Sequence, residues 1–560
     1  MEKREDLNSI LPFLPIILRS SSLFWPSKAL ESLKALALGP DVSRVDSGEV
    51  LFDAILDLRD AIGLSSERLA SRAADGYALF FDELMSRVDS RVWFGEVIPS
   101  LAKLLVRLPS LLEAHYQNAD EVFGEGKAGL RIMGPQEAGI VFLSQELIAA
   151  LLACSLFCLF ATSERSVRYL PLINFDQLFA ALHPHGKQSQ EQKIKCIVHY
   201  FERICHCMPT GFVSFERKSL PLKQSCHDIS YPKAAFWRKS TVSLCPFEVF
   251  SSGLIEEQQC EALEVDFANE YLGGGALNRG CVQEEIRFMI NPELIIGMLF
   301  MASMGYNEAI EIVGVERFSC YVGYGSSFCF AGDYLDKKLF DSIGRRKTRI
   351  VAIDALCSPR MMQYEVDCLV RETNKAFCGF LDSSIYQHCL KIFQDADENS
   401  NEVSIANRNI FPVCETTTTT EQVKDPDISE NESASNLDLI GNTENKSCQV
   451  IDSQEDIGIA TGNWGCGAFG GDPEIKSMIQ WLAASQALRP FIHYYTFGEA
   501  ALQRLEQVTQ WILLHGWTVG DLWSMIVEYS FQRLSGEANV GFLTWLLPDH
   551  STRDVQYMSE

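Results

Sequence analysis

Two adjacent glutamates, Glu284 and Glu285, follow a run of three glycines, Gly273–Gly275, at a spacing that could build a catalytic site. Consecutive glycines can adopt positive φ angles and approach a ligand closely, because no Cβ stands in the way. Apolar residues at helical spacing begin directly after the glutamates, so we expect Gln283, Glu284 and Glu285 at or near a helix start. Adjacent helical positions differ by about 100°, so the two carboxylates cannot face each other across one bond as a glycosidase pair does. We therefore expect unequal tasks: one glutamate holds sugar hydroxyls and the other transfers protons.

A structural interpretation of the same residues is that they cap a helix. Acidic residues are common in a first helical turn, and taken alone the glutamates would more often be caps than catalysts. The three glycines before the glutamates make a catalytic site more favourable than capping alone. Asp266 and Asn269 precede the glycines, and either could be an ordinary strand-end cap or turn residue, or part of the same site.

A second glycine-rich stretch, Thr461–Asp472, leads into an expected helix from Pro473 to about Ala487. Free backbone N–H groups and the positive end of a helix favour a bound phosphate. The spacing G-x-G-x-x-G occurs at Gly465, Gly467 and Gly470. No long strand precedes it, and residues 490–497 offer no Asp or Glu for a ribose hydroxyl. The sequence thus predicts phosphate binding here without a dinucleotide-binding fold.

Aromatic residues beside glycines form a third group, which comprises Tyr321, Tyr324 and Phe497. Aromatic rings at strand ends can stack on a base or a sugar, although packing in the core is more frequent.

The elements that must position these groups divide the chain into a helical part and an α/β part. From Asp6 to about Gly211, apolar residues recur at helical spacing, so we expect this part to be helical. The apolar run 147–161 within it is too short to cross a bilayer, so we expect that run to form a buried core helix. Beyond it, short β-rich runs alternate with helical segments, which is typical of a layered α/β domain. The β-rich runs are Phe212–Phe215, Ala262–Val265, Glu311–Gly314, Ile350–Ile353 and Phe491–Tyr495. We predict an accessory domain over residues 1–210 and a catalytic domain over residues 211–550.

An acidic stretch, residues 387–457, interrupts the α/β part, and we expect it to be a disordered insertion. Residues 392–457 carry 15 acidic and 3 basic residues of a chain whose formal net charge is −26. This balance argues against direct DNA or RNA binding, which depends on lysine and arginine. The basic run Arg345–Lys347 with Arg349 could steer a polyanion or serve as an import signal, although a solvated turn is the simpler interpretation.

The 18 cysteines include no C-x-x-C pair, and the N-terminus does not resemble a secretion signal, so we expect free thiols in a reducing compartment. The densest group of possible metal ligands is Cys196, His199, Cys205, His206 and Cys207. Three of them are consecutive, whereas zinc favours two separated ligand pairs. We therefore expect no metal.

Together, these segments resemble the poly(ADP-ribose) glycohydrolase family. The resemblance is carried by Val265–Asn269, Gly273–Gly275, Gln283–Glu285 and Thr461–Gly467. The family signature is three glycines, a short spacer and then Gln-Glu-Glu, and here the spacer is residues 276–282. The resemblance extends in order from about Ser251 to about Trp523, and the helical part is similar to the plant form of the family.

The resemblance implies a macrodomain-like three-layer α/β/α catalytic domain preceded by an all-helical N-terminal domain. The implied enzyme is an O-glycosyl hydrolase that cleaves ribose–ribose bonds of poly(ADP-ribose) and releases ADP-ribose without a metal or another cofactor. Glu285 would protonate the leaving ribose oxygen and then activate water, Glu284 would grip ribose hydroxyls, and Asp266 would be the third acidic residue. The residues implied for substrate binding are Ile255 and Glu256 at the adenine, Asn269 and Gln283 as orienting groups, Tyr324 closing over the ligand, Asn463, Trp464, Gly465, Cys466, Gly467 and Ala468 at the diphosphate, and Phe497 on the terminal ribose.

Two features depart from the animal pattern, namely the acidic insertion and Tyr495, where a phenylalanine is expected. Both lie outside the proton-transfer step. The implied partners are poly(ADP-ribose) and poly(ADP-ribosyl)ated proteins, and no direct nucleic-acid or membrane binding is expected. The implied location is the nucleus and cytoplasm, and the implied process is the DNA damage response. The alternatives are a catalytically weak macrodomain that only binds ADP-ribose, a mono-ADP-ribosyl hydrolase, and a nicotinamide-dependent oxidoreductase, which the missing ribose carboxylate disfavours.

Overall fold

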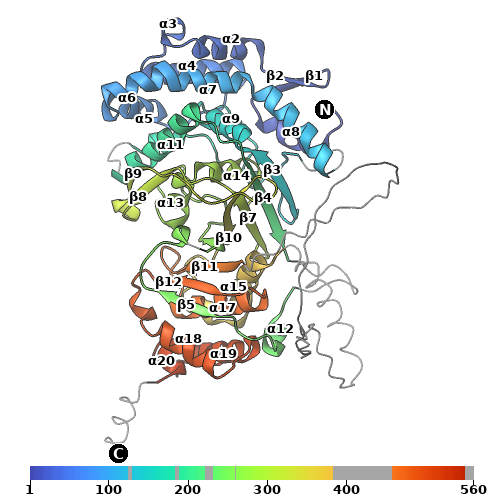
Figure 1. The fold of residues 1–560 in the computed structure, drawn as a ribbon, viewed down its shortest axis with the longest axis vertical. Helices are drawn as coiled ribbons and strands as arrows, with labels where there is room; N and C mark the ends of the chain where they lie inside the picture. The colour runs from blue at the N-terminus through green and yellow to red at the C-terminus, as the bar shows by residue number, and fades with distance from the viewer. Residues whose placement is uncertain (124–128, 183–187, 221–230, 259, 383–456, 549–560) are drawn as a thin grey trace, which may run out of the picture.

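The computed structural model describes residues 1–123, 129–182, 188–220, 231–258, 260–382 and 457–548. Helices enclose a central sheet from both sides, and further helices of the N-terminal part cover one end of the molecule (Figure 1). The predicted disordered insertion, residues 387–457, lies outside the described residues except for Ile457.

The central sheet has eight strands in the order β3-β4-β7-β10-β6-β11-β12-β5. Their bounds are β3 Gly139–Ser144, β4 Phe212–Ser219, β5 Phe247–Phe250, β6 Ala262–Asp266, β7 Glu308–Gly314, β10 Arg346–Ala352, β11 Gly458–Gly462 and β12 Ile492–Tyr495. Strands β10, β6, β11, β12 and β5 run parallel to one another, whereas the pairs β10–β7, β7–β4 and β4–β3 are antiparallel. The carboxyl ends of the five parallel strands therefore meet at one edge, where ligands bind in open α/β sheets.

Side chains of the central strands alternate between two helical layers. On β10 and its extension, Ile350 and Ala352 join the core on the side of the N-terminal helices, and Val351 and Ile353 join the core on the opposite face. Successive strand residues point to opposite faces, so both faces of the sheet are apolar and both are covered. The predicted three-layer α/β/α arrangement is confirmed.

The two helical layers come from different parts of the chain (Figure 1). One face packs against α9 (Gln145–Leu156), α11 (Gln188–His206), α13 (Gln283–Ile290) and α14 (Gly297–Phe300). The other packs against α12 (Ala234–Lys239), α15 (Val366–Phe380), α17 (Pro473–Gln486), α18 (Leu505–Leu514), α19 (Val519–Ser535) and α20 (Phe542–Leu546). Helix α9 contains most of the apolar run 147–161, and every residue of α9 except Glu146 is buried, as predicted for a core helix. Within the described ranges, no helix is long and apolar enough to cross a membrane.

The N-terminal part is mainly helical, but it also contributes strands. Its remaining helices are α1 (Glu5–Ile10), α2 (Ser27–Ala37), α3 (Pro40–Ser43), α4 (Gly48–Ala61), α5 (Ala73–Ala78), α6 (Arg87–Val92), α7 (Ile98–Val106), α8 (Leu108–Phe123) and α10 (Asp176–Ala180). The expectation of an all-helical part needs correction, because β1 (Ile17–Arg19) and β2 (Ser22–Phe24) form a hairpin and β3 is an edge strand of the central sheet. One continuous core extends from Leu7 to Ala352. The helical part is thus packed directly onto the α/β part, and the boundary near residue 210 stays a prediction.

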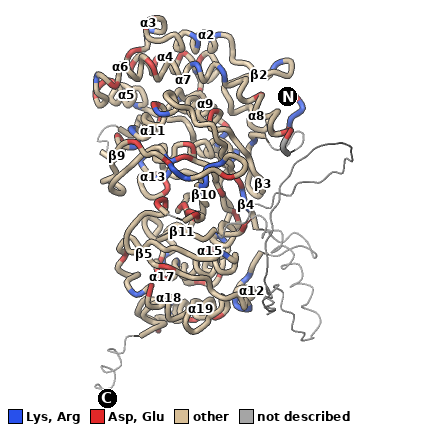
Figure 2. The backbone as a smooth tube through the Cα atoms, in the orientation of Figure 1, with Lys and Arg blue, Asp and Glu red and all other residues tan. Residues whose placement is uncertain are grey.

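The basic run at Arg345 lies at and within β10, so its interpretation as a solvated turn is wrong. Arg345 pairs with Asp341 at 2.8 Å, and Arg346 pairs with Glu316 at 3.0 Å. Arg349 and Lys347 both pair with Glu261, at 2.7 and 3.2 Å. Figure 2 shows acidic and basic residues interspersed over the described chain. These pairs neutralise the run locally.

Candidate active site

The predicted site residues gather at the carboxyl edge of the parallel strands. Asp266 is the last residue of β6, Asn463 follows β11 directly, and Phe497 follows β12 by two residues. Helix α13 begins at Gln283, which confirms that Gln283, Glu284 and Glu285 form a helix start. The topology of the sheet thus brings together residues that lie more than 200 positions apart in the sequence.

Glu284 ties the start of α13 to the glycine turn. Its Oε1 accepts a hydrogen bond from the backbone N–H of Gly273 at 2.7 Å, and its Oε2 accepts one from Asn269 at 2.9 Å. The neighbouring Gln283 accepts a hydrogen bond from the backbone N–H of Phe267 at 2.8 Å and donates one to the carbonyl of Val265 at 3.1 Å. Two side chains of the first helical turn therefore hold the end of β6 and the turn that follows it.

Glu285 spans both ends of the loop between the glycines and the helix. Its Oε1 accepts a hydrogen bond from the backbone N–H of Gly275 at 2.9 Å, and its Oε2 accepts one from Val282 at 2.8 Å. The second bond is a helix cap, so the capping interpretation holds for Glu285. The first bond directs the same carboxyl group toward the glycine turn, so capping and membership of the site coincide.

Glycine is needed where the backbone passes over these carboxylates. Gly274 has a φ of +48°, and a Cβ there would lie 2.6 Å from Glu284 Oε2 and 2.9 Å from Glu285 Oε1. A Cβ on Gly280 would lie 2.5 Å from Glu285 Oε1. Distances below 3 Å are closer than a carbon can approach, so any larger residue would displace the carboxyl groups.

The three acids are buried together, with exposed fractions of 1% for Asp266, 2% for Glu284 and 7% for Glu285. Burial raises the pKa of Asp266 to about 8, against the lowering effect of the Arg287 guanidinium and with a further rise from Glu285. Burial, followed by the charges of Asp266 and Glu285, also raises the pKa of Glu284 well above its usual range. Arg287 is itself paired with Glu264 at 2.6 Å. Like charges this close cannot all ionise, so the cluster retains a proton near neutral pH.

The second glycine-rich loop lies between the ends of β11 and β12. The Asn463 side chain donates a hydrogen bond to the carbonyl of Thr496 at 2.9 Å and accepts one from the Tyr494 hydroxyl at 3.1 Å. Among the described residues, no acceptor binds the backbone N–H groups of Gly467, Ala468 and Phe469. These three N–H groups are available to an anion, as predicted for a phosphate-binding loop.

The expected contribution of the following helix is wrong. The Asp472 carboxylate caps α17 and accepts hydrogen bonds from the backbone N–H groups of Glu474 at 2.9 Å and Ile475 at 3.4 Å. A carboxylate already occupies the positive end of the helix, so that end is not free for phosphate. Strand β11, which precedes the loop, has only five residues, which agrees with the expectation that no long strand precedes this glycine-rich stretch.

The side chains of the loop differ in their access to a ligand. Trp464 is completely buried, and its indole N–H donates a hydrogen bond to the carbonyl of Ile353 at 2.8 Å. Its ring therefore supports the loop from below and cannot contact a ligand. Gly467 and Ala468 are exposed, whereas Gly465 and Cys466 are half-buried, and burial raises the pKa of the Cys466 thiol.

Tyr324 and Phe497 are exposed, so the core-packing interpretation is wrong for both. Tyr324 is 58% exposed; partial burial raises the pKa of its hydroxyl, and the backbone of Gln283 at the start of α13 lowers it. Phe497 is 48% exposed and has a φ of +52°, a strained conformation for a residue other than glycine. Its ring lies against Gly462, where a Cβ would be 2.8 Å from Phe497 Cε2. Strained exposed aromatic residues at a sheet edge are typical of ligand-binding positions.

Ile255 and Glu256 lie in a short 3-10 turn, Ile255–Glu257. Ile255 is buried, and Glu256 accepts a hydrogen bond from the Tyr321 hydroxyl at 2.7 Å. Tyr321 belongs to β8 (Ser319–Val322), which forms a two-stranded sheet with β9 (Cys329–Asp333). The structure thus assigns Tyr321 a polar contact that its position in the sequence did not indicate.

Family models and related sequences agree with this geometry. A model described as poly(ADP-ribose) glycohydrolase, macro domain fold, matches residues 234–504, and one described as the helical domain of the same family matches residues 85–217. Poly(ADP-ribose) glycohydrolase 1 of Arabidopsis thaliana is 57% identical over 558 residues, which cover 99% of this chain and 98% of the relative. The chain belongs to the poly(ADP-ribose) glycohydrolase family.

Two further members of the poly(ADP-ribose) glycohydrolase family show how far the similarity extends. The probable poly(ADP-ribose) glycohydrolase 2 of Arabidopsis thaliana is 52% identical over 552 residues, which cover 99% of this chain and 100% of the relative. Poly(ADP-ribose) glycohydrolase 1 of Caenorhabditis elegans is 30% identical over 343 residues, which cover 60% of this chain and 35% of the relative. The plant members match over the whole length, including the helical part.

One residue of the glycohydrolase's helical part reaches the site, and sequence reasoning missed it. Lys193 of α11 donates hydrogen bonds to the carbonyl oxygens of Gly280 at 2.6 Å, Asn278 at 2.7 Å and Gly275 at 3.4 Å. It is fully buried. No local pattern marks it, because a lysine within an amphipathic helix is ordinarily read as a surface residue.

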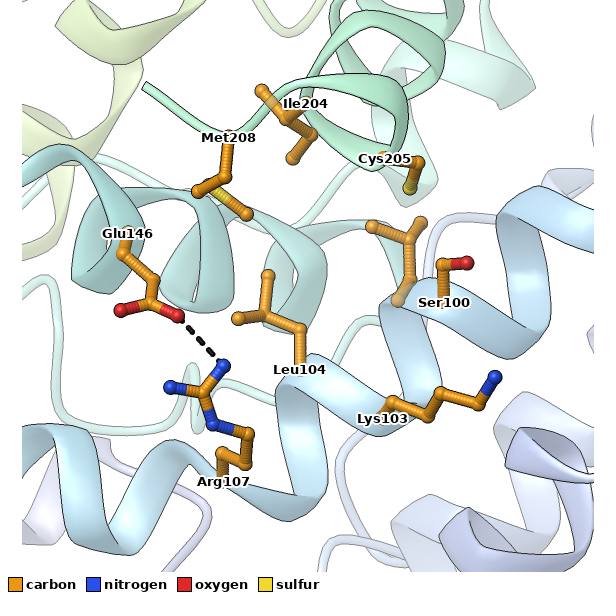
Figure 3. A pocket seen from close by; sticks show the side chains of 9 residues that line it. Ser100, Lys103, Leu104, Arg107, Glu146, Ile204, Cys205 and Met208 are labelled. Carbon is orange, nitrogen blue, oxygen red and sulfur yellow. Dashed lines mark ion pairs between the residues drawn. The ribbon is translucent and has the colours of Figure 1, made fainter. Parts of the chain in front are cut away.

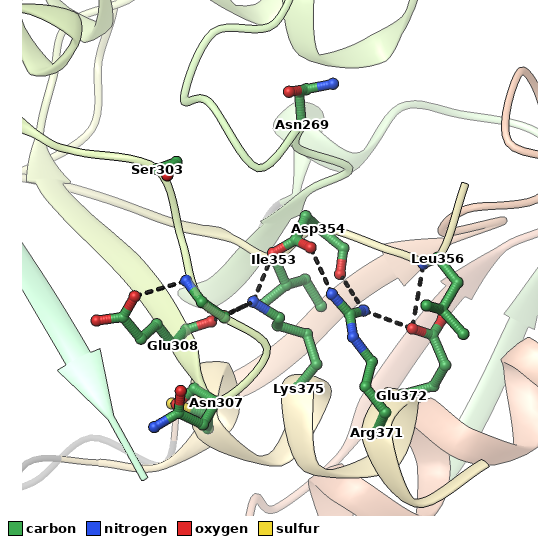
Figure 4. Close-up of polar contacts among 12 residues, drawn as sticks. Asn269, Ser303, Asn307, Glu308, Ile353, Asp354, Leu356, Arg371, Glu372 and Lys375 are labelled. Carbon is green, nitrogen blue, oxygen red and sulfur yellow. Dashed lines mark hydrogen bonds and ion pairs between the residues drawn. The ribbon is translucent and has the colours of Figure 1, made fainter. Parts of the chain in front are cut away.

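A buried charge network supports the segment after β10 in this member of the family. Asp354 pairs with Arg371 and with Lys375, each at 2.5 Å, and Figure 4 shows its carboxylate facing both cations. Glu372 accepts a hydrogen bond from the backbone N–H of Leu356 at 3.2 Å and pairs with Lys476 of α17. The network joins α15, α17 and the carboxyl end of β10.

A separate pocket of about 240 Å³ lies in the helical domain of the glycohydrolase and contains none of the predicted site residues (Figure 3). It is lined mainly by α7 and α11, and an ion pair between Arg107 and Glu146 at 2.7 Å crosses one side.

The possible metal ligands on α11 do not form a site either. His199 pairs with Asp333 at 3.0 Å, and in the part of the chain that the structure describes, no His, Cys, Asp and Glu group is arranged to hold a metal ion.

Proposed function

We propose that this chain hydrolyses the ribose–ribose O-glycosidic bonds of poly(ADP-ribose) and releases ADP-ribose. The observation that carries the proposal is the cluster of Asp266, Glu284 and Glu285 beneath the glycine turn, at the same sheet edge as the open N–H groups of residues 467–469. Acid groups that retain a proton and a loop that can bind a diphosphate are the two requirements of a glycosidase for an ADP-ribose polymer. The names of the related plant proteins support this substrate.

Glu285 is proposed as the general acid and base. It is the most exposed of the three acids, and its hydrogen bonds to Gly275 and Val282 fix the direction of its carboxyl group. In this proposal it donates a proton to the leaving ribose oxygen and then accepts one from the attacking water. Glycoside cleavage passes through an oxocarbenium-like transition state, whose positive charge the negative charge remaining in the cluster stabilises.

Glu284 and Asp266 are proposed to act on the same ribose in different ways. Each oxygen of Glu284 accepts one backbone N–H bond and keeps a lone pair for a ribose hydroxyl. Among the described side chains, none donates a hydrogen bond to either oxygen of Asp266, which leaves this carboxyl group free to share a proton with its acidic neighbours. Gln283 and Asn269 complete the set as orienting groups.

The remaining contacts are proposed along the ligand. The N–H groups of residues 467–469 bind the diphosphate, with Asn463, Gly465 and Cys466 shaping the loop. Ile255 and Glu256 read the adenine, Tyr324 covers the ligand, and Phe497 packs on the terminal ribose. The proposals of poly(ADP-ribosyl)ated proteins as partners, of a nuclear and cytoplasmic location and of a role in the DNA damage response rest on the family resemblance alone.

One assay tests this function against its alternatives. The purified protein is incubated separately with poly(ADP-ribose) and with a mono-ADP-ribosylated protein, and free ADP-ribose is measured. We expect release from the polymer. Release from neither substrate would support a macrodomain that only binds, and release from the modified protein alone would support a mono-ADP-ribosyl hydrolase.

A further inference from the structure

We propose that Lys193, on helix α11 of the helical domain, is a positioning residue of the active site that holds the loop from Gly275 to Gly280 against Glu285. This inference rests on the proposed role of Glu285 in hydrolysis. It gives the helical domain a direct part in the reaction, beyond that of a packing support.

The contacts of Lys193 are unusual for a buried lysine. Its side chain is fully buried, yet its Nζ faces three backbone carbonyls, those of Gly275, Asn278 and Gly280. An ammonium group has three N–H donors, so all of them are used. Among the described residues, no carboxylate forms an ion pair with Lys193. Lysine is rarely buried without an acidic partner, because desolvation of its charge is costly.

The loop that Lys193 binds is closed on itself. The Gly275 carbonyl also accepts hydrogen bonds from the backbone N–H groups of Asn278 at 2.9 Å and Gly280 at 3.1 Å. Several carbonyl dipoles therefore converge on one point, and the Lys193 ammonium group fills it. Without this positive charge, the converging carbonyl oxygens would repel one another, and the backbone hydrogen bonds of the loop would have to oppose that repulsion alone.

The opposite side of the same loop carries Glu285. The Gly275 N–H binds Glu285 Oε1, and Gly280 lies so close to that oxygen that a Cβ would approach within 2.5 Å. A shift of the loop therefore moves both the Gly275 N–H that donates to Glu285 and the Gly280 backbone that lies beside the carboxyl group. General acid catalysis depends on the placement of the acid to within a fraction of an ångström, so Lys193 acts on the reaction through Glu285.

The chain offers a matched pair of variants on one helix. Lys193→Met removes the ammonium group and keeps an unbranched apolar side chain that matches the four-carbon stem of lysine. Lys195→Met makes the same change two residues further on, where the lysine is more than a third exposed and pairs with Glu191 within α11. For both variants, kcat and KM on poly(ADP-ribose), the affinity for ADP-ribose, and amide hydrogen exchange over residues 273–285 are measured.

In K193M we expect kcat to fall by about 10- to 100-fold, as for a misplaced catalytic group. KM and the ADP-ribose affinity should change little, because the diphosphate loop and Phe497 belong to other segments. Amide exchange over residues 273–285 should accelerate. K195M should match the wild type in every measurement. K193Q, which keeps two N–H donors, should recover part of the lost kcat and serves as the second variant if K193M does not fold.

An unchanged kcat in K193M, or an equal loss of kcat and ADP-ribose affinity, would overturn the positioning role. Failure of both variants to fold would also overturn it, because the lysine would then serve the fold and not the site. If the wild type released no ADP-ribose, the proposed function would fail, whereas the exchange comparison between K193M and K195M would still decide whether Lys193 holds the loop.

Discussion

The backbone N–H of Gly275 donates a hydrogen bond to Glu285 Oε1 at 2.9 Å. The other oxygen of this carboxyl group accepts one from Val282 at 2.8 Å, so one side chain closes the loop between the glycine run and the helix at both ends. The spacing between the glycines and the glutamates is therefore a structural requirement. The spacer must be long enough to return the chain from Gly275 to the start of the helix, so that both N–H groups reach the same carboxyl group.

Replacement of Glu285 by glutamine tests its role as the proton donor. Glutamine keeps the shape of the side chain but cannot transfer the proton, so the rate of ADP-ribose release should fall by roughly 10²- to 10⁴-fold. Calorimetry should show that ADP-ribose still binds. The control is Glu528→Gln on the exposed surface of α19, which should leave the rate unchanged. Equal turnover by E285Q and the wild type would remove Glu285 from the mechanism.

Replacement of Gly274 by alanine tests the close approach of the turn to both carboxylates. The added Cβ would lie 2.6 Å from Glu284 Oε2, at a φ of +48°. We expect a loss of about 1–3 kcal/mol in the free energy of unfolding, together with a loss of at least about 10-fold in kcat as the carboxyl groups move. Urea denaturation and the release assay measure the two effects.

Gly95→Ala is the matched control for this substitution. A Cβ at Gly95 has open space around it, so neither stability nor kcat should fall. If G274A were as active and as stable as G95A, the turn would not approach the carboxylates as closely as the structure indicates.

The sequence predicted most strands of the sheet, because β-branched and aromatic residues mark them locally. It did not predict three strands of the sheet: β3, which lies within a helical part, the four-residue strand β5, and β11, whose residues Gly458–Gly462 include only one Ile and are otherwise small. The order of the strands in the sheet could not be predicted from the sequence either, because it depends on contacts between segments hundreds of residues apart. A local pattern can indicate that a strand exists but not which strands lie beside it.

The site shows the same division between local and distant information. Gln283, Glu284 and Glu285 were predicted at a helix start because their spacing from the glycines is a short-range pattern. Lys193 was missed because it approaches the loop only after the helical domain has packed onto the sheet. Trp464 was predicted beside the diphosphate from its place in the motif, but its ring lies in the core beneath the loop. A motif identifies the loop and does not reveal which side chains face the ligand.

The pH dependence of stability tests the burial of Asp266. Burial raises its pKa to about 8, whereas the ordinary value is 3.8. Between these values the folded protein binds a proton that the unfolded chain has lost, so this group's contribution to stability is complete below pH 4 and decreases as the pH rises to about 8. Asp266→Asn removes this dependence and also lowers the pKa of Glu284, which the charge of Asp266 raises.

Urea denaturation of wild type and D266N at pH 5 and pH 8 measures this contribution. The wild type should lose more of its free energy of unfolding between the two pH values than D266N does. Equal losses in the two proteins would show that Asp266 is ionised in the folded state, in conflict with its burial among acidic neighbours.

Phe497 allows ligand binding to be separated from stability, because it is both exposed and strained. Phe497→Ala removes an aromatic contact of about 1 kcal/mol, so the Kd for ADP-ribose should rise roughly five-fold. Phe497→Gly removes the same contact and relieves the positive φ of +52°, so it should weaken binding and raise the free energy of unfolding by about 1 kcal/mol. Phe531→Ala, at an exposed position on α19, should change neither quantity. In F497G, ADP-ribose binding should weaken while the free energy of unfolding rises. A residue that only packs in the fold would not give this combination, whereas a strained ligand-binding residue would. If F497G bound ADP-ribose as tightly as F531A, Phe497 would have no part in the site.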